Sequence, residues 1–86
     1  MVMRHHSYYD TRRGFYEDKP NWYLFELLSR YDDFIEFGDS CMLMIDWMYD
    51  NLDNVERHCR WYTSFDAFSV KFRYEKDYTW FQLVWG

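Results

Sequence analysis

Residues 68–74 read Phe-Ser-Val-Lys-Phe-Arg-Tyr, with an apolar residue at every second position. Successive side chains of a β-strand point to opposite faces, so this alternation predicts a strand with one face in the core. Residues 55–62 alternate in the same way and predict a second strand. Residues 78–85 are rich in β-forming residues and follow the polar break Glu75–Asp77, which predicts an antiparallel return strand. We expect His6–Tyr9 to add an edge strand.

Upstream of these strands, the apolar residues recur at steps of three and four, which predicts helices. The first helix begins near Asn21 and has an apolar face formed by Leu24, Leu27, Leu28, Tyr31, Phe34 and Ile35. Gly38 suits the C-terminus of that helix, and the two residues after it suit the N-cap of a second. The second apolar face comprises Cys41, Met44, Ile45, Met48, Tyr49 and Leu52. A rival interpretation breaks the first helix at Asp32–Asp33 and makes Phe34–Phe37 a strand.

These elements predict an α+β fold, with a two-helix hairpin packed on a three- or four-stranded antiparallel sheet. The 86 residues fit one small domain, 1–86, whose first sixteen residues form a basic segment rich in Tyr and Arg. Aromatic residues make up 26% of the chain, which excludes a disordered tail or a flexible linker. The longest aliphatic run, Cys41–Ile45, is far shorter than the roughly 20 residues that span a bilayer. We therefore expect a cytoplasmic protein without a membrane partner.

The sequence offers no pattern typical of catalysis or of a bound cofactor. The candidate metal ligands are His5, His6, His58, Cys41 and Cys59. Structural zinc sites use closely spaced pairs of ligands, and no such pair occurs here. The glycine-supported turns that hold nucleophiles or phosphates are missing as well. We expect a protein that is not an enzyme and uses no cofactor or metal, and whether Cys41 and Cys59 pair stays open.

The second predicted helix carries a stripe of aspartates opposite its apolar face. At about 100° per residue, the stripe and the apolar residues beside it comprise Asp39, Leu43, Asp46, Trp47, Asp50 and Asp53. Two of these aspartates lie near the C-terminal end, where negative charge opposes the helix dipole. A tryptophan ringed by charge is typical of an interface hot spot. We expect a protein partner to bind at this stripe, which could imitate a phosphate backbone.

The outward face of the predicted sheet is the alternative binding surface. Its basic and aromatic residues are His58, Arg60, Tyr62, Lys71 and Arg73. Such a face can stack single-stranded bases and neutralise their phosphates. The net charge of −5 is unfavourable for a nucleic-acid-binding protein, so this alternative ranks second.

Together these features favour a non-enzymatic protein-binding module. We expect a small stoichiometric inhibitor of phage or mobile-element type, acting in the bacterial cytoplasm. Its partner would be a nuclease or another nucleic-acid-handling enzyme of the host, as for anti-CRISPR or anti-restriction proteins. The alternatives are single-stranded nucleic-acid binding through the sheet and a structural homodimer that pairs its aromatic surfaces.

Overall fold

The computed structural model describes residues 8–28, 34–64 and 67–86, and within them it confirms the α+β class. In chain order the elements are α1 (Arg12–Glu17), β1 (Tyr23–Leu28), α2 (Phe34–Asn51), α3 (Val55–His58), β2 (Cys59–Thr63), β3 (Ala67–Phe72) and α4 (Glu75–Trp85). The three strands form one antiparallel sheet in the order β1–β3–β2. Strand β3 is therefore the central strand of the sheet.

Strand β3 forms where the alternating pattern predicted a strand. Val70 pairs with Phe25 of β1 and with Trp61 of β2, so one face of the sheet carries large apolar groups across all three strands. Phe68 and Phe72 lie on the same face, because side chains two residues apart share a face. Every residue of β3 is buried. Both faces of this strand are thus covered, rather than one as expected.

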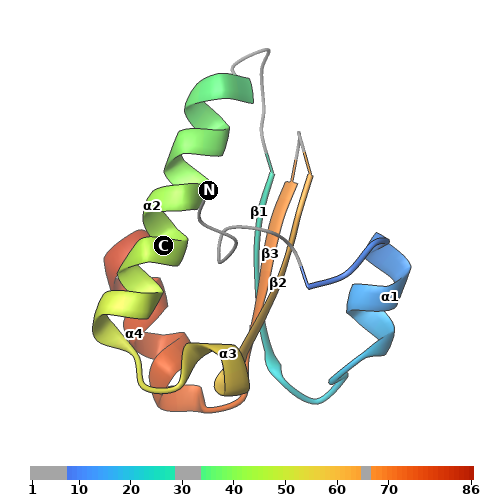
Figure 1. Cartoon of the computed structure of the whole chain (residues 1–86). Helices are drawn as coiled ribbons and strands as arrows, with labels where there is room; N and C mark the ends of the chain where they lie inside the picture. The colour runs from blue at the N-terminus through green and yellow to red at the C-terminus, as the bar shows by residue number, and fades with distance from the viewer. Residues whose placement is uncertain (1–7, 29–33, 65–66) are drawn as a thin grey trace.

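Helices lie on both faces of the sheet and make a three-layer arrangement (Figure 1). Helices α2 and α4 cover one face, and the short α1 covers the other. The main hydrophobic core lies on the side of the sheet that α2 and α4 cover. It contains Cys41, Met44, Ile45, Met48, Leu52, Val55, Cys59, Trp61, Phe68, Val70, Phe72 and Phe81. The apolar stripe predicted for the second helix therefore contributes directly to the core.

The helix predicted from Asn21 to Gly38 is wrong over residues 23–28, and with it the two-helix hairpin, whereas its last predicted residues, from Phe34 on, belong to helix α2. Tyr23–Leu28 form strand β1 and pair with β3 along their whole length. These six residues read Tyr-Leu-Phe-Glu-Leu-Leu, a sequence compatible with either a helix or a strand. Pairing with the central strand β3 favours the strand. The rival strand at Phe34–Phe37 is wrong too, because α2 begins at residue 34 and runs through Gly38. Gly38 has no positive φ, so it is an ordinary helical residue here.

The predicted strand at 55–62 is right only in its second half. Val55–His58 form the short helix α3, and β2 begins at Cys59. Asn54 has a φ of 49°, a left-handed conformation that Asn tolerates better than most residues. Its carbonyl then accepts hydrogen bonds from the N–H groups of Arg57 and His58, both at 2.9 Å. This turn converts residues 55–58 into a helix although their sequence alternates.

The return strand predicted at 78–85 is wrong, because Glu75–Trp85 form helix α4. The helix fully buries Phe81 and partly buries Tyr78 and Trp85, which lie three and four residues from it. This spacing places all three on the face that packs on the sheet. Acidic residues in the first turn, Glu75 and Asp77, also favour the start of a helix.

The predicted N-terminal edge strand lies mostly outside the described residues, which begin at Tyr8. Neither Tyr8 nor Tyr9 belongs to a strand. The N–H of Tyr8 donates one hydrogen bond of 3.2 Å to the carbonyl of Trp61 in β2. The described part of this segment therefore contacts the free edge of β2 without extending the sheet.

Candidate functional site

The aspartate stripe lies on the solvent side of α2, opposite the buried residues of that helix. Asp39 and Asp50 are exposed, and Asp53 is exposed in the turn that follows α2. Leu43 lies beside them with 59% of its surface exposed. Asp46 is half-buried and makes a further interaction. The stripe thus presents three exposed aspartates and one exposed leucine.

Trp47, the tryptophan of the predicted site, is half-buried and joins α2 to α4. Its ring packs edge-on against Trp80, with centroids 5.1 Å apart, and against Phe81 at 5.9 Å. Such edge-to-face pairs stabilise the contact between two elements. The sequence pattern could not reveal this role, because residues 78–85 were expected to be a strand.

Helix α4 exposes three large apolar side chains that the sequence analysis did not single out. Leu83 is 81% exposed, Val84 47% and Trp80 44%. Their spacing of three and four residues places them on neighbouring positions of the helix surface. The same spacing is visible in the sequence, but it places the three side chains on one surface only if residues 75–85 form a helix.

These side chains continue the exposed surface of α2. The chain runs down α2 and back up α4 in Figure 1, so the two helices are antiparallel. Trp47 contacts Trp80. Leu43 lies one turn before Trp47 and Val84 lies one turn after Trp80, so the antiparallel arrangement places Leu43 and Val84 at the same level. We call this surface the α2–α4 face. It comprises Leu43, Trp47, Trp80, Leu83 and Val84, bordered by Asp39 and Asp50 of α2 and by Asp53 in the turn after α2.

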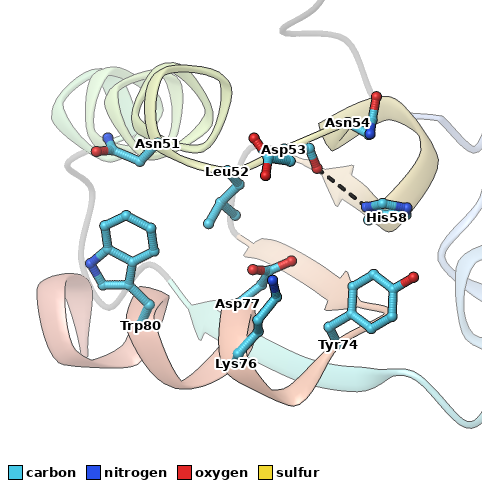
Figure 2. A pocket seen from close by; sticks show the side chains of 9 residues that line it. All are labelled: Asn51, Leu52, Asp53, Asn54, His58, Tyr74, Lys76, Asp77 and Trp80. Carbon is cyan, nitrogen blue, oxygen red and sulfur yellow. Dashed lines mark hydrogen bonds between the residues drawn. The ribbon is translucent and has the colours of Figure 1, made fainter.

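An open pocket of about 320 Å³ lies at the end of this face, between the C-terminus of α2 and the N-terminus of α4 (Figure 2). Its lining residues are Asn51, Leu52, Asp53, Asn54, His58, Tyr74, Lys76, Asp77 and Trp80. They come from the end of α2, the turn after it, α3, and the first turns of α4. The pocket therefore shares Trp80 with the α2–α4 face.

The polar groups of the pocket are held in defined positions. The Nδ1 atom of His58 is 3.2 Å from the backbone oxygen of Asp53, and its ring packs edge-on against Tyr74 at 4.8 Å. Asp77 is only 7% exposed and points into the pocket from α4 (Figure 2). The pocket thus combines aromatic walls with carboxylates and an imidazole.

The predicted basic face of the sheet is not a solvent-exposed surface. Lys71 was expected to face outward into solvent, but only 3% of it is exposed. Its Nζ donates hydrogen bonds to the backbone oxygens of Phe15 (2.6 Å), Tyr16 (3.2 Å) and Asp18 (2.6 Å). These carbonyls belong to the last turn and the C-cap of α1. Lys71 therefore anchors α1 on the sheet, and its charge is occupied within the molecule.

The other members of that predicted face are dispersed. Arg60 Nη1 donates to the backbone oxygens of Glu56 and Cys59 at 2.5 and 2.8 Å. Its guanidinium also lies 5.0 Å from the Tyr8 ring and 5.5 Å from the Trp22 ring.

Tyr62, His58 and Arg73 complete that predicted set. Tyr62 is half-buried with its ring 6.3 Å from that of Phe15. His58 belongs to α3 and lines the pocket, while Arg73 is exposed after β3 with its guanidinium over Tyr74. The five residues therefore do not form one surface.

Both cysteines are free thiols in the core. Burial raises the pKa of the Cys41 thiol to about 11 and that of Cys59 to about 12. Metal binding and nucleophilic attack use the thiolate, which these values suppress at neutral pH. Over the residues that the structure describes, no three His, Cys, Asp or Glu side chains gather where they could hold a metal ion.

These buried thiols predict a loss of stability at alkaline pH. In the unfolded chain a thiol titrates near pH 8.5, so the folded state binds more protons between that pH and its raised pKa. The free energy of unfolding should therefore fall as pH rises, by up to about 1.4 kcal/mol per pH unit for each thiol. Urea unfolding at pH 8, 9 and 10 measures the slope. The Cys41→Ala and Cys59→Ala variants should each flatten it, and an unchanged slope would contradict the prediction.

Comparisons with known proteins identified no similar protein. No protein-family model, curated protein or solved structure matches the chain. Across residues 8–28, 34–64 and 67–86, no helix has both the length and the apolar character to cross a membrane. The function is therefore inferred from the geometry of the α2–α4 face and its pocket.

Proposed function

We propose that the chain is a protein-binding module that docks through its α2–α4 face. The observation that carries this proposal is the exposure of Leu83, Val84 and Trp80 beside the aspartates of α2. Large exposed apolar patches with a polar border are typical of interaction sites in soluble proteins. Tryptophan at the centre of such a patch supplies a rigid anchor that a partner can bury.

The charge of the face favours a basic partner. Asp39 and Asp50 are eleven positions apart on one helix, which separates them by about 16 Å along its axis. The chain as a whole carries −5. Opposite charge speeds association and selects among partners more than it adds to affinity. A groove that normally holds nucleic acid offers basic residues together with apolar walls, so it complements both parts of the face.

We infer from this that the protein acts as a stoichiometric inhibitor of a nucleic-acid-handling enzyme, of phage or mobile-element type. It works by occupying the basic groove, which requires no chemistry of its own. Rigid aromatic anchors serve this role because they lose little conformational entropy on binding. The buried Lys71 counts against the alternative of nucleic-acid binding through the sheet.

Two double variants of the face test the proposal. The wild type, immobilised on beads, is used to capture and identify the partner from bacterial lysate treated with nuclease. Leu83→Ser with Val84→Ser should weaken binding of that purified partner by roughly tenfold or more. Asp50→Asn with Asp53→Asn should slow association several-fold and reduce its dependence on salt. Binding is measured by surface plasmon resonance at two salt concentrations.

A matched control carries the same charge change on the opposite side of the molecule. Asp10→Asn with Glu17→Gln removes two exposed carboxylates near α1 and should leave the affinity unchanged. Oligonucleotide should compete with the protein for the purified partner. Equal binding by all three variants, or only a second copy of this chain on the beads, would overturn the proposal. Light scattering over a dilution series identifies that self-association.

A further inference from the structure

We propose that the pocket at the end of the α2–α4 face binds a basic side chain, Arg or Lys, of the docked protein partner. This inference rests on the proposed function, because the partner supplies the side chain. The pocket and the α2–α4 face share Trp80, so the two surfaces are continuous. A partner bound on the face can therefore extend a side chain into the pocket.

Asp77 is the central group of the proposed pocket. It is more than nine-tenths buried and points into the open space rather than into the core (Figure 2). Among the described residues, nothing donates a hydrogen bond to its carboxylate and nothing forms an ion pair with it. Burial is the main cause of the raised pKa of Cys59, and the negative charge of Asp77 adds to it. The carboxylate is open to the pocket and largely shielded from bulk solvent, so a cationic group that enters the pocket can form a charge-assisted hydrogen bond with it.

The walls of the pocket suit a cation with an apolar stem. Trp80 and Tyr74 supply aromatic surfaces on the α4 side, and Asp53 faces Asp77 across the pocket (Figure 2). Cations bind favourably over aromatic faces, and the methylene groups of Arg and Lys pack on apolar surface. The pocket volume of about 320 Å³ lies at the lower end of the range for ligand sites. It therefore has room for one long side chain and its hydrating water.

The charges in the pocket favour a cation over an anion. Two carboxylates line it against a single ammonium, that of the exposed Lys76. The His58 ring is positioned through Nδ1 by the Asp53 carbonyl. Lys76 forms no ion pair with Asp77 in the described structure, so it opposes an incoming cation without occupying the site. Removing Lys76 should therefore strengthen cation binding, while removing Asp77 should weaken it.

The test uses model compounds and the isolated protein, so it does not depend on finding the partner. Amide chemical shifts are followed by NMR during titration with N-acetyl-arginine methylamide and N-acetyl-lysine methylamide. We expect millimolar binding, with the largest shifts at Asn51–Asn54, at His58 and at the Trp80 indole. The Asp77→Asn variant should bind about tenfold more weakly, and Lys76→Gln about threefold more tightly. N-acetyl-glutamine methylamide is the neutral control and should produce no comparable shifts.

Glu75→Gln is the matched control variant, because it removes an exposed carboxylate from the same helical turn without altering the pocket. Should Asp77→Asn fail to fold, Asp53→Asn tests the exposed carboxylate and should weaken binding about threefold. Equal binding by Glu75→Gln and Asp77→Asn would overturn the inference, as would equal shifts with the glutamine compound. Tighter binding of n-propylguanidine, which has the same single charge but no peptide groups, than of the arginine compound would overturn the assignment to a partner side chain.

The two proposals fail separately. A Leu83→Ser variant should bind the partner more weakly and still bind the arginine compound as the wild type does, because Leu83 does not line the pocket. Loss of arginine binding with partner binding intact would overturn the pocket alone. Partner binding that is unchanged in Leu83→Ser, with arginine binding intact, would overturn the proposed function alone.

Discussion

Replacing Lys71 by methionine is expected to lower the free energy of unfolding by about 2–3 kcal/mol. Methionine keeps the length and the apolar stem of lysine but cannot donate hydrogen bonds. The backbone oxygens of Phe15, Tyr16 and Asp18 would then lose the ammonium that they share. The positive charge at the C-terminal end of α1, which is favourable there, would be lost too.

Lys76→Met is the matched control for this prediction. Lys76 is exposed on α4, so the same chemical change there should alter stability by no more than about 0.5 kcal/mol. Urea unfolding of both variants gives the comparison. Hydrogen exchange locates the effect, and in Lys71→Met the amides of α1 should exchange faster than those of β3. Equal stability of the two variants would show that Lys71 does not anchor α1.

Replacing Phe81 by alanine is expected to cost about 3–5 kcal/mol, a large share of the roughly 5–15 kcal/mol that holds a domain folded. The ring is fully buried. It packs 4.9 Å from Phe25, 5.1 Å from Phe72 and 5.9 Å from Trp47, measured between ring centroids. Its removal opens a cavity where β1, β3, α2 and α4 meet.

Leu83→Ala on the same helix should change stability by less than about 0.5 kcal/mol, because Leu83 is exposed. The pair also tests the secondary structure of residues 75–85. In a strand, residues 81 and 83 share a face and would respond alike. In a helix they are about 200° apart and respond differently. Similar losses in thermal unfolding for both variants would contradict helix α4.

Strand β3 and the apolar stripe of α2 could be predicted because the spacing of their apolar residues matches one type of secondary structure in each case. The alternation at Phe68, Val70 and Phe72 fits only a strand, and the stripe through Met44 and Met48 fits only a helix. In both segments the local period agrees with the final burial. The exposed positions of Asp39 and Asp50 on α2 could be predicted from the same helical period, whereas Asp46 is half-buried.

Strand β1 and helix α4 could not be predicted, because their sequences satisfy two structures. Residues 23–28 have helical spacing, yet β3 needs a second neighbour and pairs with them. Residues 78–85 are β-forming, yet as a helix they bury Phe81 against the sheet. Tertiary packing outweighs local propensity in both cases.

The part of the candidate site on α4 was missed for the same reason. An exposed patch at Trp80, Leu83 and Val84 exists only if residues 75–85 form a helix. The pocket joins residues from three helices and the turns beside them, and no local sequence pattern predicts such a site. The buried role of Lys71 was equally hidden, because α1 lies more than fifty residues away along the chain.

That separation sets the order in which the molecule can be completed. The hydrogen bond from Lys71 to Phe15 spans 56 residues, so the N-terminal helix leaves the ribosome long before its anchor is made. Closing so long a loop carries an entropic cost that local contacts within α1 do not offset. A helix of six residues is also too short to persist alone in water. During synthesis, α1 therefore has no docking site until the central strand has emerged, and only then can it cover the second face of the sheet.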